Sequence, residues 1–151
     1  MSETKPARVP PRWVVRSAWA VHRGIYRGSG GRLGLSRPRG NKYGLLRLTT
    51  TGRRTGRERG VIVAYLLDGP RYTTLAMNGW GEPEPAWWLN LKAHPEARID
   101  LGGGPQPIRA RAASGDERVR LWELWSTVDK NLDGYAALRS RETAVVVFEP
   151  L

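Results

Sequence analysis

The 151-residue sequence contains no cysteine, only two histidines and a single phenylalanine. The absence of cysteine excludes disulfide bonds, thiolate nucleophiles and cysteine-ligated zinc or iron–sulfur sites. His22 and His94 lie neither near a Gly-x-Ser-x-Gly motif nor at a histidine–carboxylate ligand spacing, so we expect no catalytic histidine and no metal site. If the protein is an enzyme, a bound organic cofactor must carry the reaction.

Long apolar runs are also missing from the sequence. No stretch approaches the roughly 20 apolar residues of a membrane-spanning helix, and the first residues do not resemble a signal peptide. We therefore expect a soluble, cytoplasmic protein. We assign residues 1–30 to a flexible leader with a basic amphipathic helix, and residues 31–151 to one domain, since a chain of this length is sufficient for a single core.

Positive charge is present in excess, with a formal net charge of +11, and it is concentrated in the first third of the chain. Residues 1–60 contain 15 Lys and Arg against two acidic residues, whereas the rest is close to neutral. Over residues 12–27 arginines and apolar residues fall on opposite faces of a predicted helix. This helix either packs on the domain or, as an alternative that stays open, contacts the inner face of the plasma membrane.

The pattern of short apolar runs predicts the fold class. Residues 28–44 are rich in glycine and arginine and predict a loop or linker. Six strands are predicted, at residues 45–51, 61–67, 72–77, 97–101, 107–113 and 143–150. Three helices are predicted, over residues 86–94, from Ser114 through Val128, and around residues 135–139. Short links between consecutive strands favour an α+β fold on an antiparallel sheet that curls into a small barrel.

The segment TTTGRRTGRER, residues 49–59, places four arginines on a turn with two glycines. A glycine- and threonine-rich turn exposes backbone N–H groups and hydroxyls, and each guanidinium group binds phosphate or carboxylate through two parallel hydrogen bonds. The turn therefore suits a compact polyanion, although an ordinary hairpin with solvent-exposed arginines fits the same pattern. It is not a Walker loop, because the Gly-Lys-Ser/Thr ending is absent.

A second segment, AMNGWGEPEPAWWLNLKAHP at residues 76–95, joins a glycine-containing loop to a short helix with two adjacent tryptophans, Trp87 and Trp88. Neighbouring side chains on a helix point about 100° apart. One tryptophan therefore belongs to the core, and the other is free to line a pocket for a flat ring system.

These two segments, together with the closing RETAVVVFEP, resemble the deazaflavin-dependent nitroreductase family, a group of coenzyme F420-dependent oxidoreductases. The resemblance covers roughly residues 43–151 and is strongest over residues 49–95. It implies a split β-barrel like that of the FMN-binding, pyridoxamine-phosphate-oxidase-like proteins, with peripheral helices. It also implies F420, a deazaflavin with a phosphate and an acidic glutamyl tail, as the cofactor.

The resemblance also implies the site residues. The phosphate and tail would be bound by the basic turn, through Gly52, Arg53, Arg54, Thr55, Gly56 and Arg59. The remaining cofactor contacts would come from Val61, Ile62, Val63, Ala76, Met77, Asn78, Ala86, Trp87 and Asn90. Tyr135 is the candidate proton donor or substrate contact, because it is the one tyrosine that matches those over the substrate side in nitroimidazole-reducing members.

The implied function is that of a reductase in which hydride passes from C5 of the deazaflavin to an electron-poor acceptor, such as a quinone or an enone or other activated alkene. The proton would come from solvent or from Tyr135. Alternatives are an F420 carrier without turnover, a protein that binds FMN or heme in the same fold, and a basic nucleic-acid-binding protein. We expect no nucleic acid, because Tyr43 and Tyr65 are the only aromatic residues between residues 28 and 71. We expect a monomer or a homodimer.

Overall fold

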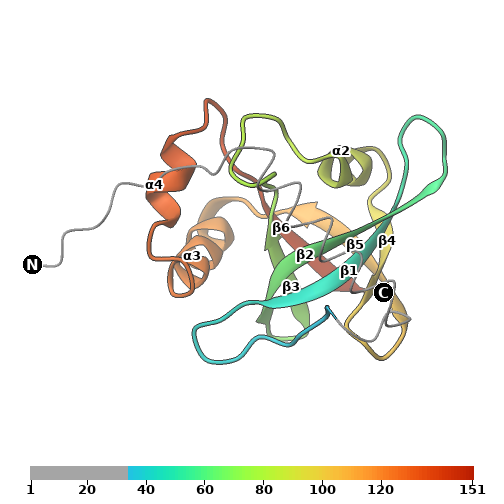
Figure 1. Ribbon diagram of the computed structural model, residues 1–151, viewed down its shortest axis with the longest axis horizontal. Coiled ribbons are helices and arrows are strands. Elements are labelled where there is room, and N and C mark those ends of the chain that lie inside the picture. The colour runs from blue at the N-terminus through green and yellow to red at the C-terminus, as the bar shows by residue number, and fades with distance from the viewer. Residues whose placement is uncertain (1–33) are drawn as a thin grey trace, which may run out of the picture.

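The computed structural model describes residues 34–151, so the leader and the helix predicted over residues 12–27 lie outside the described residues. Within that range six strands close into an antiparallel barrel (Figure 1). In barrel order they are β1 (Gly44–Thr51), β2 (Glu58–Asp68), β3 (Arg71–Leu75), β6 (Val145–Pro150), β5 (Pro105–Ala112) and β4 (Glu96–Asp100), which pairs with β1. The predicted α+β barrel of six antiparallel strands is confirmed.

Strand β6 is apolar along most of its length because both of its faces pack against other side chains. Its side chains alternate between the two faces of the sheet. Val146 and Phe148 lie in the cluster that fills the barrel, and Val145 and Val147 lie in a second cluster outside it. Both faces of the strand are therefore buried, which confirms the interpretation of its continuous apolar run.

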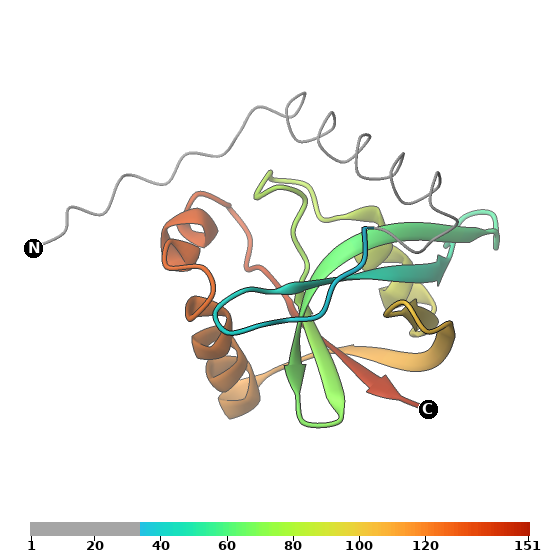
Figure 2. The ribbon, with the colours of Figure 1, turned by 60° about the horizontal axis from the view of Figure 1, so that its bottom comes forward.

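The helices cover two different parts of the barrel. Helix α2 (Ala86–Ala93) packs its Trp88 and Leu91 into the cluster inside the barrel. Helices α3 (Gly115–Ser126) and α4 (Leu132–Ala137) lie together on another side, where Leu121, Trp125 and Leu132 fill the outer cluster. Figures 1 and 2 show this separation of α2 from the α3–α4 pair.

Several element boundaries differ from the predicted ones. Strand β3 ends at Leu75 instead of Met77, because the Ala76 N–H donates to Ala144 O and the Met77 N–H turns back to Leu75 O. Strand β2 begins at Glu58, where it pairs with Thr51, so the connection from β1 is shorter than predicted.

The helix ends differ in smaller ways. Ser114 occupies the position before α3, as predicted, but its side chain forms no capping hydrogen bond. Helix α4 begins at Leu132, three residues before the predicted start at Tyr135. No helix within residues 34–151 is long and apolar enough to cross a membrane.

Candidate functional site

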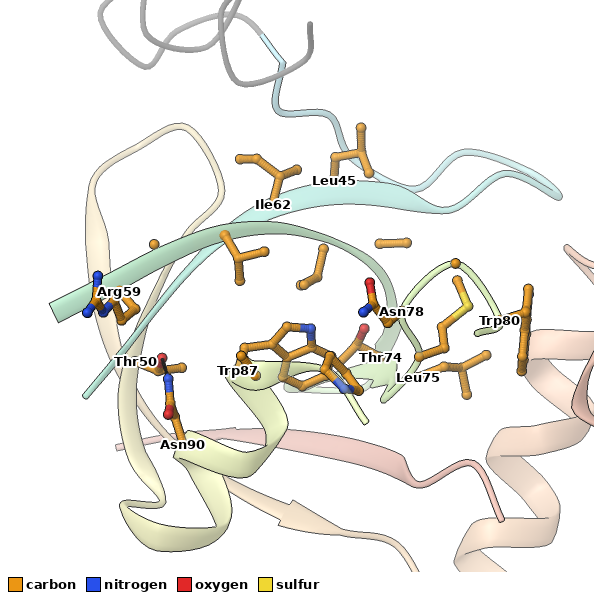
Figure 3. A pocket seen from close by; sticks show the side chains of 18 of the residues that line it. Leu45, Thr50, Arg59, Ile62, Thr74, Leu75, Asn78, Trp80, Trp87 and Asn90 are labelled. Carbon is orange, nitrogen blue, oxygen red and sulfur yellow. Dashed lines mark hydrogen bonds between the residues drawn. The ribbon is translucent and has the colours of Figure 1, made fainter. Parts of the chain in front are cut away.

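A cavity of about 680 Å³ is formed where the β1–β2 connection, helix α2 and the loop after β3 meet. Figure 3 shows Arg59 at one end of this cavity and Trp80 at the opposite end, with Trp87 between them. The lining is polar and cationic near Arg59, and it is mostly apolar along β2 and toward Trp80. The two sequence segments that predicted a site therefore contribute to one cavity.

The basic turn, residues 52–57, is held by its own backbone. The Gly52 N–H donates to Arg57 O, and the Gly56 N–H donates to Gly52 O, both at 2.8 Å. Gly56 has a φ of +71°, which favours glycine. A Cβ at Gly52 would lie 3.0 Å from Arg57 O and 3.3 Å from Thr55 Oγ1, so a side chain at this position would push against the backbone of the turn.

Helix α2 fixes the basic turn through Asn90, which is 4% exposed. Asn90 Oδ1 accepts hydrogen bonds from the backbone N–H of Arg53 at 3.2 Å and from Arg53 Nη1 at 3.0 Å. Asn90 Nδ2 donates to Thr50 Oγ1 at 3.2 Å. One buried amide therefore connects the helix to the end of β1 and to the first arginine of the turn.

Few carboxylates pair with the arginines at the Arg59 end of the cavity. Arg54 and Arg59 are exposed, and neither forms a hydrogen bond or an ion pair with any residue in the range 34–151. Glu58, the carboxylate nearest in sequence, forms an ion pair with Arg98 of β4. Arg54 of the basic turn and Arg59 at the start of β2 therefore have no partner within the described residues and are available to an anionic ligand.

The two tryptophans of α2 both belong to the apolar cluster inside the barrel, so the prediction that only one of them is part of the core is wrong. Trp87 in addition lines the cavity, whereas Trp88 does not, as the helical geometry predicts. Their rings meet edge to face, with centroids 6.4 Å apart and an interplanar angle of 64°. Both are buried, at 8% and 6% exposure. The position of Trp87 is consequently set by a close neighbour in the core.

Trp80 lies at the end of the cavity farthest from Arg59 (Figure 3). Met77 and Trp125, which also line the cavity, belong to the same apolar cluster as Trp80, and the Asp129 N–H of the lining donates to Trp125 O. The Asn78 side chain makes no hydrogen bond within the described part of the chain. In Figure 3 Asn78 and Thr74 point into the middle of the cavity. They are therefore available to a ligand bound there.

Of the sixteen predicted site residues, thirteen line this cavity. They are Gly52, Arg53, Arg54, Thr55, Arg59, Val61, Ile62, Val63, Met77, Asn78, Ala86, Trp87 and Asn90. The other three lie close by without lining it. Gly56 forms the bend of the turn, Ala76 is buried inside the barrel, and Tyr135 stacks against the Trp80 ring on α4.

The structure adds lining residues that the sequence did not indicate. These include Tyr43, Leu45, Thr50, Gly60, Ala64, Thr74, Leu75, Pro85 and Trp125. Most of them belong to strands, where strict alternation identifies two faces but not which face meets a cavity. Whether Thr50 and Thr74 face the cavity depends on how the sheet closes into a barrel. Short-range sequence patterns do not encode this closure.

Residues 19–150 match the family described as F420H(2)-dependent quinone reductase. The chain belongs to this family. A relative from Mycobacterium tuberculosis (strain ATCC 25618 / H37Rv), an F420H(2)-dependent quinone reductase, is 33% identical over 143 residues, which make up 90% of this chain and 95% of the relative.

Two solved structures are similar to the chain at 27% sequence identity each. One, the F420-H2 dependent reductase FDR-A, has a TM-score of 0.63 and is matched over 70% of this chain and 93% of its own. The other, described as a domain-swapped dimer, has a TM-score of 0.67 and is matched over 93% of this chain and 100% of its own. The split β-barrel that the resemblance implies is confirmed.

Membership of the F420H(2)-dependent quinone reductase family confirms three sequence-based expectations. The protein is an oxidoreductase, its cofactor is coenzyme F420, and the resemblance to F420-dependent reductases is correct.

Proposed function

We propose that this protein reduces an electron-poor acceptor, and specifically a quinone, with F420H2 bound in the cavity described above. One observation carries the proposal: the cavity has a cationic end, whose Arg54 and Arg59 have no acidic partner among residues 34–151, and a mostly apolar wall along β2 and Trp87. An elongated cofactor with an anionic tail and a flat ring matches this division in both charge and shape.

The basic turn is the proposed seat of the phosphate and the acidic tail. Guanidinium groups form paired, charge-assisted hydrogen bonds with phosphate and carboxylate oxygens. Arg54 and Arg59 have no acidic partner among residues 34–151, so binding an anion there breaks no ion pair within that range. Arg53 is already oriented by Asn90, which lowers the entropic cost of fixing its side chain.

The region around Trp87 is the proposed seat of the ring. Ile62, Val63 and Trp87 are buried apolar residues of the cavity wall, and Val61 and Ala86 complete it. Such a wall excludes water from the reacting atoms and strengthens electrostatic interactions inside the cavity. Asn78 adds a free carboxamide, which suits hydrogen bonding to a ring carbonyl or ring nitrogen.

When bound, reduced F420 supplies a hydride from C5, which with one proton converts a quinone into a hydroquinone and leaves oxidised F420. The protein holds donor and acceptor in contact, and this alignment is the main contribution that positioning makes to the rate. The Tyr135 ring packs against Trp80 and does not line the cavity. This geometry favours solvent over the Tyr135 hydroxyl as the proton source.

A single-turnover experiment tests the proposed function. Protein loaded anaerobically with F420H2 is mixed with a benzoquinone, and the absorbance of oxidised F420 is followed against the same mixture without protein. We expect one hydroquinone per bound cofactor at a rate well above the uncatalysed rate. Binding without acceleration for any quinone or enone would instead indicate a carrier, and absence of binding would reject the site.

Two further proposals concern association. A homodimer is supported by the similar solved structure that is described as a domain-swapped dimer, and light scattering decides between it and a monomer.

Membrane contact through residues 12–27 rests on the sequence alone. Co-sedimentation with anionic liposomes, with and without residues 1–30, tests it, and equal pelleting of both forms would contradict it.

A further inference from the structure

Trp80 has an unusual backbone conformation for a bulky residue. Its φ is +60°, and it is the only residue other than glycine within residues 34–151 with a positive φ. Left-handed backbone brings Cβ close to the following carbonyl oxygen, so it favours glycine and opposes large side chains. Such strain persists only where surrounding contacts hold the residue in place, and it often occurs at functional sites.

The contact that holds Trp80 comes from α4. The Trp80 and Tyr135 rings are stacked, with centroids 5.9 Å apart and an interplanar angle of 10°. Stacked aromatic pairs stabilise a fixed relative orientation of the two rings. Trp80 is 8% exposed and belongs to the same apolar cluster as Trp125 and Leu132. The indole is therefore fixed in position and in plane.

The segment after α4 fixes both ends of the loop that carries Trp80. Arg139, which is buried, donates from Nη1 to Ala76 O and from Nη2 to Glu82 O, both at 3.4 Å. The Glu82 carboxylate accepts hydrogen bonds from the Ser140 N–H at 3.0 Å and from Ser140 Oγ at 2.7 Å. The loop is thus anchored before and after Trp80 by one neighbouring segment.

Trp80 lies at the end of the cavity opposite Arg59 (Figure 3). The proposed phosphate seat is at the Arg59 end, so a cofactor ring near Trp87 leaves the Trp80 end for the acceptor. A glycine at residue 80 would fit the backbone better than tryptophan does. The backbone of the loop alone therefore does not require tryptophan at residue 80. We infer that the strained conformation is retained because the indole side chain has a role at this end of the cavity.

We propose that Trp80 is the end wall of the acceptor site and restricts it to compact acceptors, such as single-ring quinones and enones. This proposal rests on the proposed function, because it assigns the space beyond the ring to the acceptor. The stacked Tyr135 holds the wall in place, which makes it a positioning residue. Removal of the indole extends the cavity and admits a fused two-ring quinone.

The Trp80→Gly variant tests the proposal, with Trp80→Asn as a second variant because asparagine also tolerates left-handed backbone. We measure kcat/KM for a two-ring naphthoquinone and for a single-ring benzoquinone. The ratio of the two values is expected to rise by about tenfold or more in both variants, a typical effect of added pocket volume. The dissociation constant of F420 is expected to change by less than about twofold, because its proposed contacts are the basic turn, Trp87 and Asn78, and none of them is the Trp80 side chain.

Trp122→Ala is the matched control, since Trp122 packs on the same outer cluster but does not line the cavity. An equal rise of the ratio in this control, or an unchanged ratio in both Trp80 variants, would overturn the proposal. If the wild type reduces neither quinone, the proposed function fails. In that case the proposal for Trp80 is tested by binding alone. The affinity of the F420-loaded protein for the naphthoquinone relative to the benzoquinone must still rise in the Trp80 variants, and an unchanged ratio of the two dissociation constants would overturn the proposal.

Discussion

The Asn90 carboxamide accepts two hydrogen bonds from Arg53, one from its backbone N–H at 3.2 Å and one from Nη1 at 3.0 Å. These two residues are 37 positions apart in sequence, and their contact joins helix α2 to the basic turn. The helix that carries Trp87 and the turn that carries the arginines therefore form one unit. In the proposed function this unit sets the distance between the tail and the ring of the cofactor.

Asn90→Ala is expected to weaken F420 binding about tenfold or more, because the turn loses its link to α2. The change also leaves the buried Thr50 hydroxyl without its partner, which costs about 1–3 kcal/mol of the free energy of unfolding. Fluorescence titration with F420 and urea unfolding measure the two effects. Thr50→Val separates them, since it removes the Thr50 contact and leaves Arg53 bonded to Asn90. Equal F420 affinity in all three proteins would contradict this role of Asn90.

Trp87 and Trp88 are expected to respond differently to substitution, although both are buried. Each change to alanine removes a large side chain from an apolar cluster and costs about 3–5 kcal/mol of stability. Only Trp87 lines the cavity, so Trp87→Phe, which retains much of the packing, is expected to slow hydride transfer and weaken F420 binding. Trp88→Phe is the paired control. Stopped-flow oxidation of bound F420H2 distinguishes them, and the same rate in both variants would contradict the assignment of Trp87 to the ring.

Tyr135→Phe tests the proton source. The substitution preserves the ring that stacks on Trp80 and removes only the hydroxyl. Because that ring does not line the cavity, kcat is expected to stay within about twofold of the wild type, whereas loss of a general acid typically lowers the rate about 100-fold or more. The pH dependence of kcat is expected to be unchanged. A large loss of kcat would show that the hydroxyl reaches the acceptor after a rearrangement of Trp80.

The free energy of unfolding is expected to fall in acid, because two carboxylates outside the cavity lose their stabilising interactions with arginines when they are protonated. Hydrogen bonds from Arg120 lower the pKa of Asp68, and hydrogen bonds from Arg111 lower the pKa of Glu117. A carboxylate whose pKa is lower in the folded state stabilises the fold above its unfolded pKa, near 4, and loses that contribution as the pH falls through its folded pKa. The urea midpoint is therefore expected to be nearly constant from about pH 7 to 5 and to fall below about pH 4. Arg120→Gln is expected to reduce the fall, and an identical pH profile in this variant would contradict the contribution of Asp68.

Much of the barrel was predictable because its signals are local. Glycine, proline and charged residues separate the strands, and the apolar run of β6 indicates burial on both faces. Helical geometry predicted that only one of the two tryptophans lines the cavity, but it did not predict that Trp87 also belongs to the core cluster. The boundary errors at Met77 and Glu58 arose where long-range pairing, with Ala144 and with Thr51, decides where a strand ends.

The remaining features of the site depend on contacts between distant segments. The bond from Asn90 to Thr50 spans 40 residues, and the Trp80–Tyr135 stack brings α4 against the loop after β3. No short-range pattern indicates that a tryptophan adopts a positive φ, since propensity favours glycine there. The arginines were recognised from composition, but their lack of acidic partners within residues 34–151 is visible only once Glu58 is seen to pair with Arg98.

The most direct test of the central claim is an F420 titration of the Arg54→Glu/Arg59→Glu double variant. The account predicts that the variant retains the circular dichroism spectrum and the urea midpoint of the wild type, because both side chains are exposed and unpaired within the described residues, and that it loses F420 binding by at least about 100-fold. Arg109→Glu, on the exposed face of β5, is a charge-reversal control outside the cavity and is expected to bind F420 like the wild type. An unchanged dissociation constant in the double variant would contradict the account.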